Sequence, residues 1–106
     1  TLCVEFFIDR NENLYVNEIA PRVHNSGHLT INSYNVSQFE NHVRAVCKLE
    51  QVPLKKISNA IMTNIIGDQI AYYRTKEFNE NEFFFDYLKK EIKQKRKMGH
   101  LTTLLK

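Results

Sequence analysis

The sequence contains few of the residues that mark several specialised classes of protein. Among its 106 residues there are only two cysteines, Cys3 and Cys47, which excludes a disulfide-stapled scaffold and favours a reducing compartment. Three glycines and two prolines exclude collagen-like and low-complexity chains. Apolar runs reach only three residues, as at 83–85, whereas a membrane-spanning helix needs about 20. We therefore expect no membrane partner.

Positive charge is gathered in one short segment, residues 89–97, here called the basic segment. It holds six of the 15 Lys and Arg residues and one of the 12 acidic residues, although the whole chain has a net charge of only +3. Such a cluster attracts anions, including phosphate groups and nucleic acid. A solvated surface segment has the same composition, so charge alone does not decide its role.

Hydrophobic periodicity predicts an α+β chain. Apolar residues alternate over 2–8 and again over 14–19, which predicts two strands joined by a turn as an antiparallel hairpin. Ser37 followed by Glu40 is a capping box, and it opens a predicted helix over 37–47. The remaining predicted segments are a loop at 23–30, a buried strand at 60–66, and short strands at 83–88 and 101–105.

Two glutamates of the predicted hairpin are the first candidates for chemistry. An even-length turn centred between Asn11 and Glu12 would place Glu5 opposite Glu18, with Cβ atoms about 4.5–5.5 Å apart. Opposed carboxylates need neutralisation, and Mg²⁺ bound together with substrate phosphates would supply it. A shared proton is a second possibility. A different register, in which each glutamate meets a surface cation, is a third.

The segment 17–28 is dense in polar side chains. Arg22 offers a planar fork that suits a carboxylate or a phosphate. His24, Asn25 and Ser26 add hydrogen-bond donors and acceptors close by. These residues could bind a small anionic ligand beside a metal, or they could satisfy the backbone of a hydrogen-bonded turn. Composition alone favours neither interpretation.

Five blocks of sequence then follow one another in a characteristic order. They are Val4-Glu5-Phe6-Phe7 with 17–30, and then 37–45, 53–54, 64–68 and 96–100. In this order they resemble the 5-(carboxyamino)imidazole ribonucleotide synthases, ATP-grasp ligases of purine biosynthesis. The resemblance runs from residue 2 to about residue 104. It implies the C-terminal portion of an ATP-grasp domain over 1–50, followed by a small β-rich C-terminal domain over 51–106.

The resemblance also implies an activity. In this family ATP and bicarbonate form carboxyphosphate, and 5-aminoimidazole ribonucleotide is carboxylated. The implied cofactors are ATP and Mg²⁺, and the implied partner is the remaining part of the same enzyme. We expect the complete enzyme to be a cytoplasmic homodimer, and this chain to be inactive as a fragment on its own.

Roles for individual residues come from the same resemblance. Glu5 and Glu18 match the family's metal ligands, and Asn17 joins Glu18 at the ATP site. Arg22 matches the arginine beside bicarbonate or carboxyphosphate, which makes it the candidate catalytic residue. The candidates for binding the ribonucleotide are His24, Asn25, Ser26, Lys89, Arg96 and Lys97.

Two other interpretations compete with the ligase. The basic segment, together with the aromatic residues at 83–85, could form a small RNA-binding module. The chain could also be an inactive relative that serves as an assembly surface. Because Glu5, Glu18, Arg22 and the Arg96-Lys97 pair are all present, the ligase is favoured, and no nucleic acid partner is expected.

Overall fold

The computed structural model describes residues 1–105 and confirms the α+β class. Strands β1 (Cys3–Ile8) and β2 (Leu14–Ala20) form an antiparallel hairpin. Strands β3 (Asn59–Ile66), β4 (Glu82–Asp86) and β5 (Lys97–Leu105) form an antiparallel sheet in the order β3-β5-β4. The helices are α1 (Thr30–Ser33), α2 (Gln38–Val46) and α3 (Gln69–Tyr73), with a 3-10 turn, η1 (Asn25–Gly27), before α1.

The hairpin pairs Glu5 with Glu18, as the sequence predicts, but for a different reason. Ile8 pairs with Leu14, so the connecting loop, 9–13, has five residues and the expected even-length turn is wrong. The register then shifts between Glu5 and Phe6, which leaves Asn17 without a partner opposite it. This β-bulge restores the pairing of the two glutamates.

Helix α2 begins where the capping box predicts. The Ser37 side chain accepts a hydrogen bond from the Glu40 backbone N–H at 3.1 Å. The apolar stripe of the helix, by contrast, is open to solvent, with Phe39, Val43 and Val46 all exposed. The amphipathic pattern therefore specifies the helix, but most of its apolar stripe is left uncovered within residues 1–105.

The prediction of an irregular loop over 23–30 is wrong, because the segment contains regular helical turns. It contains η1 and the start of α1. The Thr30 hydroxyl donates to the Gly27 carbonyl at 2.6 Å and accepts from the Gln38 backbone N–H at 2.9 Å. These local side-chain-to-backbone bonds stabilise tight turns that have no hydrophobic periodicity to reveal them.

A small core lies where α3 covers the sheet. Its buried residues are Ile65, Ile70, Met98 and Leu101. The prediction of a buried strand over 60–66 is wrong, because β3 alternates between half-buried and exposed residues up to Ile65. An antiparallel sheet covered on one face produces this alternation. Helix α3 was not predicted, since five residues are too few to show a helical period.

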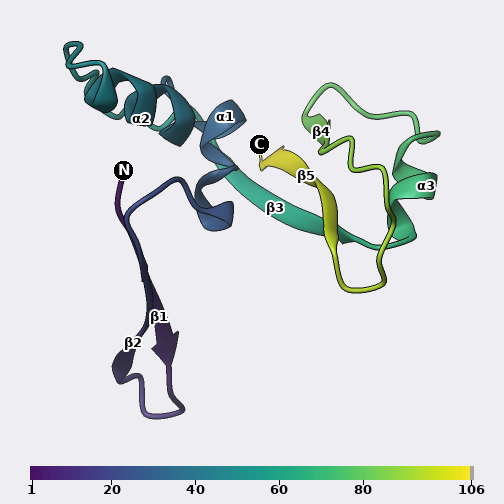
Figure 1. Ribbon diagram of the computed structural model, residues 1–106, viewed down its shortest axis with the longest axis horizontal. Helices are drawn as coiled ribbons and strands as arrows, with labels where there is room; N and C mark the ends of the chain where they lie inside the picture. The colour runs from purple at the N-terminus through teal and green to yellow at the C-terminus, as the bar shows by residue number, and fades with distance from the viewer. Residues whose placement is uncertain (106) are drawn as a thin grey trace.

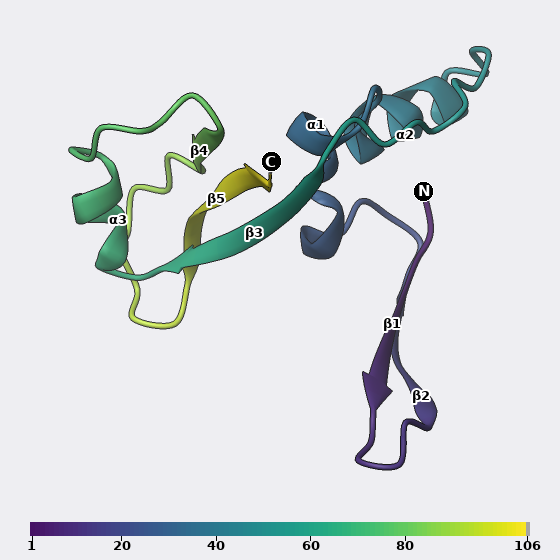
Figure 2. The same cartoon turned by 180° about the vertical axis from the view of Figure 1, so that it is seen from behind.

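The molecule is open rather than compact. Its radius of gyration is 15.7 Å, compared with about 13 Å for a compact domain of 100 residues. The β1–β2 hairpin extends away from the sheet in both views (Figures 1 and 2). Within residues 1–105 no helix is long and apolar enough to span a membrane.

Candidate functional site

The bulged end of the hairpin brings the two glutamates and Asn17 together. Glu5 and Glu18 face each other across the strands, and the Asn17 side-chain amide donates to Glu5 Oε1 at 2.7 Å. A bulge of this kind re-aims a side chain, because two residues of one strand oppose one residue of the other. Asn17 can therefore reach across to the Glu5 carboxylate, which lies opposite Glu18, the next residue on its own strand.

Two further donors approach the same carboxylates. His24 Nε2 lies 3.8 Å from Glu5 Oε2 and 3.7 Å from Glu18 Oε1. Arg22 Nη2 lies 3.5 Å from Glu18 Oε1. The carboxylates are nearly half exposed, so these long contacts hold them only loosely. The approach of His24 to both glutamates was missed by the sequence analysis, which placed His24 with the ribonucleotide.

The tautomer of neutral His24 follows from its neighbours. The backbone N–H of Ser26 donates to His24 Nδ1 at 3.3 Å, and the Ser26 hydroxyl lies 2.8 Å from the same atom. Since Nδ1 accepts a hydrogen bond, the proton of the neutral ring is on Nε2. His24 therefore turns an N–H toward the two carboxylates.

The donor set at the hairpin suits a metal that is shared with a phosphate ligand. Within residues 1–105 no group of three or more His, Cys, Asp or Glu side chains is arranged to hold a metal ion. Mg²⁺ commonly takes only one or two carboxylates from the protein and completes its shell with substrate phosphates and waters. Glu5 and Glu18 fit that pattern and do not fit a metal held by the protein alone.

Gln38 fixes the loop that carries His24. Its Oε1 accepts from the His24 backbone N–H at 2.9 Å, and its Nε2 donates to the His24 carbonyl at 2.7 Å and to His28 Nδ1 at 2.8 Å. The orientation of the Gln38 amide is thus fixed, because a backbone N–H can only donate to its oxygen and a backbone carbonyl can only accept from its nitrogen. Gln38 lies in one of the blocks that carry the resemblance, but its own type gave no sign of this contact.

A second group of candidate residues meets around Asn25. Lys97 Nζ donates to Asn25 Oδ1 at 3.1 Å, and Asn25 Nδ2 donates to Asn64 Oδ1 at 2.9 Å. Lys89 Nζ donates to the Lys97 carbonyl at 2.6 Å and lies 5.2 Å above the Tyr87 ring. Residues 72 positions apart in sequence are thereby brought to one place.

Arg96 is placed differently from its neighbour Lys97. Its Nη1 donates to the Glu91 carbonyl at 3.5 Å, the one side-chain hydrogen bond of Arg96 within the described part of the chain. The basic segment is not a uniform positive face either, because Lys93 pairs with Glu91 at 3.2 Å. The structure therefore gathers Lys89 and Lys97 near Asn25 and leaves Arg96 exposed beside them.

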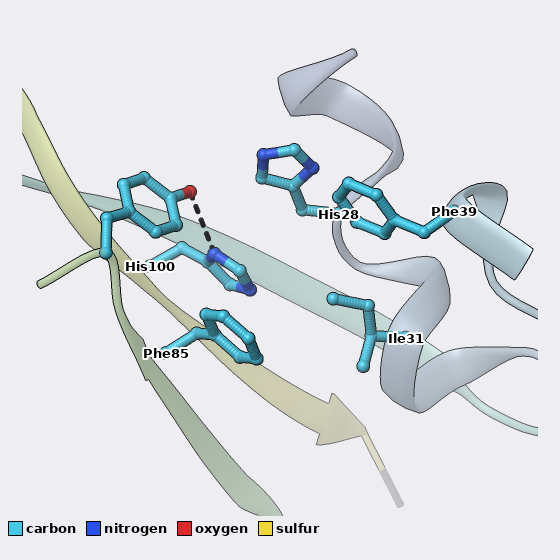
Figure 3. Close-up of a pocket in the computed structure, with 6 residues that line it drawn as sticks. His28, Ile31, Phe39, Phe85 and His100 are labelled. Carbon is cyan, nitrogen blue, oxygen red and sulfur yellow. Dashed lines mark hydrogen bonds between the residues drawn. The ribbon is translucent and has the colours of Figure 1, made fainter. Parts of the chain in front are cut away.

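A cavity of about 410 Å³ lies between helices α1 and α2 on one side and strands β4 and β5 on the other (Figure 3). Its lining residues are His28, Ile31, Phe39, Phe85, Tyr87 and His100.

The two histidines of this cavity are held in their neutral forms. Burial lowers the pKa of His100 to about 4, with a smaller contribution from the charge of His28. Burial also lowers the pKa of His28, helped by Lys97 and His24. Tyr87 Oη lies 2.9 Å from His100 Nδ1 (Figure 3). The cavity wall is therefore apolar and uncharged near pH 7.

Comparison with known proteins decides the family. Residues 1–39 match the ATP-grasp domain, and residues 60–106 match the phosphoribosylaminoimidazole carboxylase C-terminal domain. The N5-carboxyaminoimidazole ribonucleotide synthase of Staphylococcus haemolyticus is 45% identical over an alignment of 107 positions, which covers 98% of this chain and 28% of that protein. The chain belongs to the N5-carboxyaminoimidazole ribonucleotide synthase family. This is the family that the five sequence blocks resemble.

Solved structures agree with that assignment. The crystal structure of N5-carboxyaminoimidazole synthetase from Staphylococcus aureus matches with a TM-score of 0.88 at 41% identity, covering 98% of this chain and 29% of that one. The synthase from Aspergillus clavatus, in complex with ADP and 5-aminoimidazole ribonucleotide, matches with a TM-score of 0.86 at 35% identity, covering 98% and 30%. The chain thus spans less than a third of the length of its relatives. The boundary between residues 50 and 51 stays a prediction.

Proposed function

We propose that this chain supplies the metal-binding carboxylates and part of the ribonucleotide site of an N5-carboxyaminoimidazole ribonucleotide synthase. In that reaction ATP transfers its γ-phosphoryl group to bicarbonate, which gives ADP and carboxyphosphate. The carboxyphosphate then releases phosphate as its carbon joins the amine of 5-aminoimidazole ribonucleotide. The observation that carries the proposal is the pairing of Glu5 with Glu18, beside Asn17 and Arg22, in a chain of this family.

Glu5 and Glu18 would hold Mg²⁺ jointly with the ATP phosphates. When bound, the ion would neutralise phosphate charge during transfer. The proposal is supported by the two facing carboxylates, which supply the hard oxygen ligands that Mg²⁺ prefers. Asn17 holds Glu5 in place through its amide. Because it is next to Glu18 in the sequence, it would also contribute to the ATP site.

Arg22 is the proposed catalytic residue. Its Nη1 donates to the Val23 carbonyl at 3.0 Å and its Nη2 approaches Glu18, yet 62% of the side chain remains exposed. The guanidinium is therefore anchored but retains N–H groups that can face an anion. A planar cation in this position would stabilise the charge of bicarbonate or carboxyphosphate beside the metal.

The ribonucleotide would lie between the loop at His24 and the basic segment. His24, Asn25 and Ser26 would line its ring and ribose, and the cations would receive its 5′-phosphate. Support comes from Lys97, whose ammonium touches Asn25, and from Lys89, which donates to the Lys97 backbone. Exposed Arg96 is available to the same phosphate. This convergence on one loop favours a small phosphate over RNA.

The proposal extends to the assembly and the cellular location of the complete enzyme. We propose that the complete enzyme is a homodimer working in the cytoplasm on 5-aminoimidazole ribonucleotide and bicarbonate, without nucleic acid or membrane.

The test compares ATP hydrolysis by the complete enzyme with and without 5-aminoimidazole ribonucleotide, in Mg²⁺ and bicarbonate. The wild type should release ADP faster when the ribonucleotide is present. Glu18→Gln should lose about 100-fold or more of that rate, because a neutral amide is a poor Mg²⁺ ligand. Glu12→Gln is the matched control, since Glu12 lies in the exposed loop of the same hairpin. An unstimulated wild type would contradict the proposal.

A further inference from the structure

Asn64 has no role in the site as described so far, yet it contacts that site directly. It lies on β3 opposite His100 of β5, and its Oδ1 accepts from Asn25 Nδ2 at 2.9 Å. We propose that Asn64 is a positioning residue that orients Asn25 and, through it, holds the Lys97 ammonium ready for the phosphate group of the ribonucleotide. This inference rests on the proposed function and deepens it.

The polarity of the network follows from Lys97. An ammonium group can only donate hydrogen bonds, so Asn25 must present its oxygen to Lys97, at 3.1 Å. The nitrogen of the Asn25 amide then points to Asn64, and Asn64 must accept with its own oxygen. Each partner therefore has one possible orientation, and Asn64 anchors the nitrogen end of the Asn25 amide.

Burial makes Asn64 the anchored end of this network. The Asn25–Asn64 hydrogen bond is partly buried, whereas the Lys97–Asn25 bond is exposed. Asn64 belongs to a strand that pairs with β5 along its whole length, while Asn25 belongs to a single 3-10 turn. The paired strand therefore holds Asn64 in place, Asn64 holds Asn25, and Asn25 holds the Lys97 ammonium.

Removing the acceptor at Asn64 would release the Asn25 amide. The Asn25 nitrogen would then lose its bond to Asn64, and its oxygen would no longer be held at a fixed position beside Lys97. Lysine has a flexible four-carbon stem, so an unanchored ammonium loses more freedom when a phosphate binds. A remote phosphate is held equally in the ground state and the transition state, so the loss should affect KM and not kcat.

The experiment measures kcat and KM for 5-aminoimidazole ribonucleotide in the complete enzyme. Asn64→Leu removes the acceptor and should raise this KM about tenfold, with kcat and the KM for ATP unchanged. Asn64→Gln keeps a neutral amide oxygen as acceptor and should bring the KM back toward the wild-type value. Asn59→Leu is the matched control, because Asn59 lies on the same strand and its side chain also accepts a side-chain hydrogen bond, from Lys56, away from the site. Equal KM values for Asn64→Leu and wild type would overturn the inference.

A second measurement separates this inference from the proposed function. Binding of inorganic phosphate to each complete variant can be followed by ³¹P NMR whether or not the enzyme turns over. Weaker phosphate binding in Asn64→Leu, restored in Asn64→Gln, supports the positioning role even if the ribonucleotide fails to stimulate the wild type. Failure of Asn64→Gln to restore phosphate binding would overturn it, because the acceptor oxygen would then not be what matters.

Discussion

Glu5 and Glu18 keep their charges close together because each has nearby hydrogen-bond donors. Asn17 donates to Glu5, Arg22 approaches Glu18, and the Nε2–H of His24 lies between the two carboxylates. These donors approach the carboxylate oxygens of Glu5 and Glu18, which are the same atoms that would bind a metal ion. The side chains around the pair are thus suited both to the free state and to a metal-bound one.

The buried His100 leads to a prediction about acid stability. Its pKa is lowered from 6.5 to about 4 by burial first and by the charge of His28 second. Between those values the unfolded chain binds a proton that the folded chain does not, so the free energy of unfolding falls as the pH is lowered from about 6.5 toward 4. Urea denaturation of the complete protein at neutral pH and at about pH 5 measures this loss.

His100→Gln isolates the contribution of that one group. Glutamine can still bond to the Tyr87 hydroxyl, which lies against His100 in the fold, and His28 continues to titrate in both proteins. The wild type should therefore lose more unfolding free energy than the variant over the same pH interval. Equal losses would show that His100 does not titrate in this range.

At the scale of single elements, the 3-10 turn η1 packs closely against the first residue of α2. The contact is between Gly27 of η1 and the Gln38 side chain. A Cβ atom on Gly27 would lie 2.5 Å from Gln38 Oε1 and 2.7 Å from its Cδ. The Gln38 amide cannot move aside freely, because it is held by both backbone groups of His24 and by His28. Gly27→Ala should therefore destabilise the complete protein by about 1–3 kcal/mol, measured by urea denaturation.

A double-mutant cycle shows whether the clash acts through Gln38. In a Gln38→Ala background the obstructing amide is gone, so Gly27→Ala should add less than about 0.5 kcal/mol of destabilisation. If the two substitutions were simply additive, the contact between Gly27 and Gln38 would not be the cause.

The elements that the sequence predicts are those with a local signal. Alternating apolar residues predict the hairpin, and Ser37 with Glu40 predicts the start of α2. The β-bulge at Asn17 has no such signal, so the facing glutamates were correctly predicted from a turn of the wrong length. Contacts such as Gln38 with His24 depend on a 3-10 turn and a helix packing together, which periodicity does not describe.

At the scale of the whole molecule, the hairpin exposes apolar side chains on both of its faces. Phe6, Phe7, Ile8, Leu14 and Ile19 are all exposed, and a hairpin of two strands is marginally stable by itself. The accessible surface is 7965 Å², compared with roughly 6,200 Å² for a compact protein of this mass. The chain also spans 28% of the length of a relative such as the Staphylococcus haemolyticus synthase. Catalysis is accordingly proposed for the complete enzyme and not for this chain alone.

The central claim is that this chain serves a ligase that joins bicarbonate carbon to the amine of 5-aminoimidazole ribonucleotide. The most direct test supplies ¹³C-bicarbonate, ATP, Mg²⁺ and the ribonucleotide to the complete enzyme and follows the label by NMR. The account predicts labelled carbon on the exocyclic amine, with one ADP released for each labelled product. Label on a ring carbon, or ADP release without any labelled product, would contradict it.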